Sequence, residues 1–130
     1  MLLSALILLA AQDKPLDCEK DQSQLALNLC ADRDYHAADA EMSAQWKRTL
    51  AVVHGFDKDP DYPPGKKTYS QKLIEAQRAW LAYRDAHCAS ASHRPAAGSM
   101  EPMLFSLCML GLTEERRQQL ADIAGGGRDE

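Results

Sequence analysis

The chain has 130 residues, a formal net charge of -4, four cysteines and 45% hydrophobic residues. This length suits a single domain. The mild acidity disfavours nucleic-acid binding, which needs a surplus of lysine and arginine to neutralise phosphates, and it suits a basic partner instead.

An uncharged apolar stretch, MLLSALILLAA, occupies residues 1–11 and ends at the polar residues 12–14. Its length predicts a signal peptide, and it is too short to span a bilayer, which takes roughly 20 apolar residues. The alternative is a buried N-terminal helix. We expect residues 12–124 to form one domain, soluble in the periplasm or secreted, and residues 125–130 to form a disordered tail.

A long helix is predicted from Ser23 to His54, a segment without proline or glycine and rich in alanine, leucine, glutamine and glutamate. Ser23 can cap its start, and Gly55 can end it in a left-handed conformation. The apolar face of this helix includes Trp46, and Asp39 lies in the middle of the same face. Because aspartates at positions 32 and 34 could cap a second helix, a break near Ala31 remains open.

Residues 56–67, FDKDPDYPPGKK, contain three prolines and one glycine, which predict a loop. Asp57, Asp59 and Asp61 make this loop acidic, and Tyr62 lies beside them. These four residues are therefore the candidate contact for a basic partner. The alternative is a solvated connector with no binding role.

The sequence Thr68-Tyr69-Ser70-Gln71 fits a capping box that opens the next helix, which runs to about Cys88. Residues spaced three or four apart form the apolar face of this helix, and Trp80 and Arg84 belong to that face. Two polar residues, Gln77 and Arg84, therefore lie on the apolar face of this helix.

Further along, Ser99 can cap a short apolar helix that Gly111 ends, and Thr113 can cap a last helix. No segment alternates with period two for long enough to form a strand. The sequence thus predicts an all-α, disulfide-stapled bundle of about four to five helices. The long first helix should pack antiparallel to the helix that contains Trp80 and Arg84.

One polar network is expected inside this bundle. Asp39 and Arg84 lie on facing seams, and either charge buried alone would cost several kcal/mol, so we expect them to pair. Asn28 and Gln77 complete the expected network. We favour a structural role that sets helix register, with a ligand-binding cluster as the alternative. Trp80 precedes Arg84 by four residues, which places the guanidinium over the indole, and the alternative for Trp80 is carbohydrate binding.

The four cysteines behind a signal-like segment predict two disulfides. Cys88 ends one helix and Cys108 lies in the next, so a bridge between them closes a helical hairpin. Cys18 and Cys30 then pair if residues 18–22 fold back along the first helix. Cys18–Cys88 with Cys30–Cys108 remains the rival connectivity. The residues before Cys18 are not the small ones that lipid attachment needs, so no lipid anchor is expected.

No catalytic constellation stands out in the sequence. None of the four histidines forms the i, i+4 pair of a helical zinc site, and no pair of cysteines has metal-binding spacing. The nucleophile motif of hydrolases and the glycine-rich phosphate loop are also missing. We therefore expect no metal, no cofactor and no enzymatic activity.

The run from Gln77 to Cys88, QRAWLAYRDAHC, resembles the signature of the LprI-like N-terminal domain family. Further matches flank it at Asp17, Cys18, Gln24, Asn28, Cys30, Tyr35, Ala38, Asp39, Gly98, Ser99, Pro102, Met103, Cys108 and Leu112 to Arg116. The resemblance covers nearly all of the expected mature chain and implies a small exported helical domain. Among the shared residues, Trp80, Tyr83 and Asp85 are expected in the core.

The family takes its name from a member that inhibits lysozyme. The resemblance therefore implies a non-enzymatic exported protein that binds lysozyme or another basic envelope protein. The alternatives are a structural or interaction module of the envelope and a small glycan-binding domain. Two departures stand out: the named member is a lipoprotein, and Ala97 stands where the family often has glycine. The shared residues look like core, so binding is expected from outside the motif.

Overall fold

The computed structural model describes residues 15–125, so the predicted signal peptide and residues 126–130 lie outside its description. Its three α-helices are α1 (Gln24–Phe56), α2 (Tyr69–Ser92) and α3 (Glu101–Gly125), and a 3-10 turn, η1 (Gly98–Met100), leads into α3. The fold is all-α, but the expected count of four to five helices is wrong for this part of the chain. None of the three helices is both long and apolar enough to cross a bilayer.

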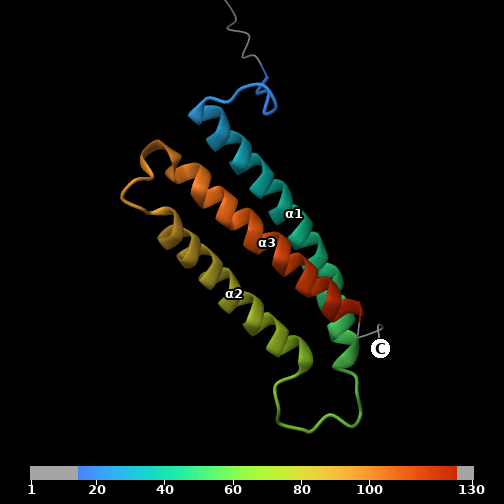
Figure 1. The fold of residues 1–130 in the computed structure, drawn as a ribbon. Helices are drawn as coiled ribbons and strands as arrows, with labels where there is room; N and C mark the ends of the chain where they lie inside the picture. Colours follow the sequence, from blue (N-terminus) through green and yellow to red (C-terminus); the bar gives the residue numbers. More distant parts are fainter. Residues whose placement is uncertain (1–14, 126–130) are drawn as a thin grey trace, which may run out of the picture.

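The helices alternate in direction along the chain (Figure 1). α2 runs antiparallel to α1, as the sequence led us to expect. α3 then runs parallel to α1, and these two packed helices make the most extensive contact of the bundle. The main neighbour of the long first helix is therefore the last helix rather than α2.

The start of each long helix follows the local sequence. Ser23 accepts a hydrogen bond from the backbone N of Ala26 at 3.2 Å. At the start of α2, Thr68 and Gln71 form the reciprocal capping box. The expected stop at Gly55 is wrong, because α1 continues to Phe56 and the helical conformation extends to its cap at Asp57. α1 also has no break near position 31.

α3 differs most from the sequence-based expectation: it is one continuous helix, where the sequence predicts two short helices, the first ended by Gly111. Glycine inside a helix costs about 1 kcal/mol relative to alanine. Burying a methionine side chain contributes about 1.5–3 kcal/mol. Met109 and Thr113 are 4% and 0% exposed, so the residues on either side of Gly111 are anchored in the bundle and the helix continues through it. Ser99 likewise lies in the turn η1 and starts no helix of its own.

The apolar core is small and lies toward the end of the bundle where α1 meets the loop. It centres on Met42, Val53, Leu73 and Leu120. Half-buried side chains packed against it are Trp46, Leu50, Trp80 and Leu81. With so few large core residues, the polar contacts and disulfides between the helices carry much of the task of fixing their positions.

Candidate functional site

Arg84 of α2 lies at the point where the three helices meet. Its side chain is 7% exposed, and its Nη1 donates to Asp39 Oδ1 of α1 at 2.9 Å. Nη1 also donates to Thr113 Oγ1 of α3 at 3.2 Å, and Nε donates to Asp85 Oδ1 at 2.9 Å. One guanidinium thus connects all three helices through charge-assisted hydrogen bonds.

Aromatic rings flank this guanidinium. The Arg84 Cζ lies 5.1 Å from the Trp80 ring and 5.6 Å from the Tyr35 ring, both within cation–π range. Arg116 of α3 also approaches Trp80, with its Cζ at 5.8 Å, and its Nε donates to Gln77 Oε1 at 2.9 Å. Burial lowers the pKa of Arg116. Two arginines therefore approach the indole of Trp80.

The Arg84 charge is well compensated. Burial alone would lower its pKa, but hydrogen bonds to the carboxylates of Asp39 and Asp85 act in the opposite direction and raise it overall. Arg84 is therefore a permanently charged member of the cluster. Because buried charges need partners, this arrangement fixes the register of α1, α2 and α3 relative to one another.

Three carboxylates act electrostatically on Tyr35, and their negative charge exceeds the single positive charge of Arg84. Burial is the main cause that raises the pKa of Tyr35; Arg84 acts against it, and Asp39, Asp85 and Asp32 add to it. The side chains of Asp32, Asp39 and Asp85 are 54%, 36% and 59% exposed. We call Tyr35, Asp32, Asp39 and Asp85 the Tyr35 surface, an acidic face with an aromatic centre.

Two residues expected in this network lie elsewhere. Asn28 accepts from Gln24 Nε2 at 2.8 Å and donates to the Ser99 carbonyl at 3.0 Å, near the start of α1. Gln77 is buried but bonds Arg116 instead of Arg84 or Asp39. The expectation of a single network of four residues is therefore wrong.

The residues expected in the core divide into two groups. Trp46 and Trp80 are half-buried against the apolar core. Tyr83 is 55% exposed and stacks on His87 with ring centroids 5.3 Å apart, so its expected core position is wrong. Asp85 is also exposed, although it bonds Arg84. Each helical residue turns about 100° from the next, so neighbours of Arg84 in sequence face outward.

Several members of the cluster are not predicted by the sequence. Tyr35 precedes Asp39 by four residues and so shares its helix face, which was a usable indication. The sequence predicts Thr113 as a helix cap, and it places Arg116 in the family pattern without a contact in the cluster. No local pattern reveals that α3 brings both of these residues to α2, because that contact depends on the continuity of α3.

The loop between α1 and α2 is less suited to a basic partner than its aspartates suggested. Asp57 accepts from the backbone N of Ser70 at 3.0 Å and from its hydroxyl, which satisfies donors at the start of α2. Tyr62 donates its hydroxyl to the Lys67 carbonyl at 2.6 Å. Residues 57–67 also contain three lysines against three aspartates, so the loop has no net charge. Asp59 and Asp61 are its remaining exposed acids.

We expect Asp57→Asn to lower the free energy of unfolding at neutral pH. Hydrogen bonds from Ser70 hold the pKa of Asp57 below its ordinary value. A depressed pKa in the folded state stabilises the fold above the unfolded pKa of about 4, and this contribution disappears as the pH falls through the folded pKa.

Urea unfolding of both proteins at pH 7 and at about pH 3 checks this expectation. The difference between them should shrink at the lower pH. Asp61→Asn, at an exposed position of the same loop, is the matched control and should not differ from the unchanged chain. A difference for Asp57→Asn that is equal at both pH values would contradict the role of its ionised form.

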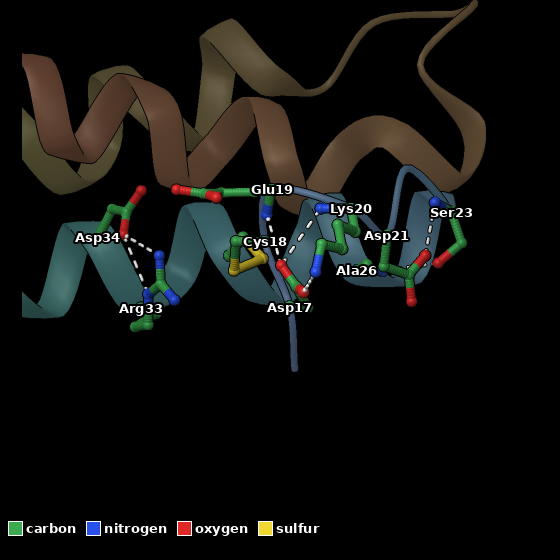
Figure 2. Close-up of a disulfide and its surroundings, with 10 residues drawn as sticks. Asp17, Cys18, Glu19, Lys20, Asp21, Ser23, Ala26, Arg33 and Asp34 are labelled. Atoms are coloured by element: carbon green, nitrogen blue, oxygen red, sulfur yellow. Dashed lines mark hydrogen bonds and ion pairs between the residues drawn. A yellow bond between two sulfur atoms is a disulfide. The ribbon is translucent and has the colours of Figure 1, made fainter. Parts of the chain in front are cut away.

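The structure contains the disulfides Cys18–Cys30 and Cys88–Cys108, with Cα–Cα distances of 5.9 and 5.5 Å. The segment before α1 folds back along its first turns (Figure 2). Asp17 Oδ1 accepts from the backbone N of Glu19 at 3.2 Å and thereby closes the turn that carries Cys18. Cys88 is 0% exposed, so the second bridge lies inside the bundle.

Between residues 15 and 125, no three His, Cys, Asp or Glu side chains gather closely enough to hold a metal ion. The charged groups around Arg84 are paired with one another. The exposed side of the cluster is the Tyr35 surface, which is negatively charged and has an aromatic centre.

Comparison with known proteins gives one family and one relative. The family model described as lysozyme inhibitor LprI matches residues 17–120. An uncharacterised protein of Rhizobium meliloti (strain 1021) is 41% identical over 114 residues, which is 87% of this chain and 82% of the relative. No solved structure matches the chain significantly.

Proposed function

The chain belongs to the family of the lysozyme inhibitor LprI, and on this premise we propose that it is a non-catalytic protein that binds and inhibits lysozyme-type muramidases. The observation that supports this proposal is the Tyr35 surface. Its three carboxylates outnumber the one guanidinium among them. A surface of this charge attracts a basic protein and favours complementary contact.

We further propose that the protein acts in the periplasm or after secretion, with residues 1–11 as its signal peptide and residues 12–124 as the mature domain. Two disulfides in a chain of this size support an oxidising compartment. Such a location would bring the protein to the cell wall, where a muramidase acts.

The Tyr35 surface and the loop of residues 57–67 are rival contact sites for lysozyme. The loop has no net charge, and Asp57 is engaged with α2. The Tyr35 surface has a net negative charge and is held in place by the buried Arg84. A rigid surface loses less entropy on binding than a loop does, so we favour the Tyr35 surface.

Lysis of a peptidoglycan suspension by a basic lysozyme tests this proposal. The purified oxidised protein should inhibit in proportion to its concentration, whereas a reduced, heat-unfolded sample should not. We expect Asp32→Asn with Asp85→Asn to weaken inhibition about tenfold, since two exposed charges are together worth about 1–2 kcal/mol. Asp59→Asn with Asp61→Asn removes the same charge from the loop and should leave inhibition unchanged.

The opposite ranking of the two double variants would assign binding to the loop. Absence of inhibition by the unchanged protein would sink the proposed function, and an envelope module with another basic partner would then be the proposal to pursue. Glycan binding at Trp80 has less support, because Arg84 and Arg116 both approach the indole.

A further inference from the structure

An open pocket lies at the end of the bundle where α1 begins, α2 ends and α3 begins. Its volume is about 690 Å³. Residues from all three helices and from η1 line it: Asn28, Ala89, Ser92, His93, Gly98, Ser99, Glu101, Pro102 and Phe105. This size is within the usual range of sites for small ligands.

The lining combines apolar side chains with polar groups that are mostly engaged. Phe105 and Pro102 of α3 and Ala89 of α2 are its apolar members. The Asn28 amide bonds Gln24 and the Ser99 carbonyl, so its oxygen and nitrogen both have partners. Ordered polar groups among apolar side chains are typical of a preformed site.

Glu101 supplies the only acidic side chain in this lining. Its Oε1 lies 3.1 Å from His93 Nδ1, and Oε2 has no hydrogen-bond partner among the described residues. The carbonyls at the end of α2 add partial negative charge, whereas the start of α3 adds partial positive charge that Glu101 itself offsets. Arg94, the nearest basic residue in sequence, lines a separate small cavity.

Two carboxylates of the Tyr35 surface lie on the helices that line the pocket. Asp32 follows Asn28 by four residues on α1, and Asp85 precedes Ala89 by four residues on α2. Residues four apart lie on one face of a helix, so both carboxylates are one turn from the pocket. Negative charge therefore lies in the pocket and one helical turn from two of the residues that line it.

We propose that this pocket binds an arginine side chain, with the aliphatic stem on Pro102 and Ala89, the guanidinium near Glu101 and the Phe105 ring beside it. Arginine combines an apolar stem with a charge that pairs with carboxylates and stacks on aromatic rings. Resting on the proposed function, the arginine belongs to the basic lysozyme and anchors it beside the Tyr35 surface. Arginine is one of the residues that most often dominate binding at interfaces.

Titration with N-acetylarginine amide, followed by amide NMR shifts of the oxidised protein, tests the pocket without lysozyme. The shifts should map to Ala89, Ser99 and Phe105. N-acetylnorleucine amide, which has an apolar side chain similar to the aliphatic stem of arginine and no charge, should bind about fivefold or more weakly. Binding of both probes with equal affinity, or shifts confined to other sites, would overturn the proposal.

Two variants complete the test. Glu101→Gln should weaken both the arginine probe and lysozyme inhibition about threefold to tenfold. Glu114→Gln removes an exposed acid from the same helix outside the pocket and should change neither. If the probe binds and Glu101→Gln weakens it, but the unchanged protein does not inhibit lysozyme, the pocket is supported and the choice of lysozyme as partner is wrong. If the protein inhibits lysozyme but Glu101→Gln does not weaken binding of the arginine probe, the pocket proposal fails and the proposed function stands.

Discussion

Arg84→Ala should lower the free energy of unfolding by about 3 kcal/mol, the lower end of the cost of breaking a buried ion pair. The substitution strands Asp39, leaves Thr113 without its charged donor and removes the cation that lies between Tyr35 and Trp80. We expect the lower end because the Asp39 side chain is 36% exposed, so water compensates part of the lost interaction.

Urea unfolding of the variant and the unchanged protein measures this effect. Arg78→Ala, an exposed arginine on the same helix, is the matched control and should change stability by less than about 0.5 kcal/mol. A loss for Arg84→Ala no larger than that of the control would show that the ion pair does not stabilise the bundle.

A double-mutant cycle separates the pair from the other contacts of Arg84. Asp39→Asn with Arg84→Ala should cost less than the sum of the two single substitutions, because the second change no longer strands a charge. Arg84→Lys should recover only part of the stability, since an ammonium cannot bond Asp39, Asp85 and Thr113 with the geometry of a guanidinium.

Removal of the buried disulfide by Cys88→Ala with Cys108→Ala should cost about 3 kcal/mol. The bridge closes a segment of 20 residues, and constraining a loop of this length in the unfolded chain gives a stabilisation of about that size. Alanine is the appropriate replacement because serine would bury a hydroxyl at position 88, which is 0% exposed.

Cys18→Ala with Cys30→Ala is the comparison for this variant. Its loop is shorter, with a separation of 12 residues, and it holds a segment at the edge of the bundle. Without the bridge, that segment gains freedom in the folded state as well as in the unfolded state, so part of the effect cancels. In thermal and urea unfolding, Cys88→Ala with Cys108→Ala should lose more stability than Cys18→Ala with Cys30→Ala. The reverse order would show that the N-terminal segment contributes more to the fold than its position suggests.

The sequence predicted those parts of the fold that depend on neighbours along the chain. Ser23 and Thr68 begin α1 and α2 because their side chains bond the backbone two or three residues ahead. The Asp39–Arg84 pair also followed from spacing, because each lone charge on an apolar face requires a partner.

The sequence failed where contacts between distant helices decide the outcome. The local sequence around Gly111 predicts the end of a helix, yet the helix continues because Met109 and Thr113 are buried against other helices. Asn28 shares the seam of Asp39, but eleven helical residues separate them by roughly 16 Å, too far for one network. A shared face of a helix therefore does not place two residues in one site.

The candidate site was predicted in part. Asp39, Trp80 and Arg84 were named from the sequence, whereas the place of Tyr35 beside them was not. The loop was favoured because its aspartates were counted without its lysines. The engagement of Asp57 with Ser70 could not be known before the relative position of α1 and α2 was known.

The disulfides join cysteines that are consecutive in the sequence, the first to the second and the third to the fourth. Under the proposed export, which starts from the N-terminus, Cys18 and Cys30 enter an oxidising compartment together, well before Cys88. Each cysteine then meets its native partner first, and the two closed loops neither interlock nor overlap. Oxidation in order of emergence therefore yields the native connectivity without reshuffling, so the protein should mature with little need for a disulfide isomerase.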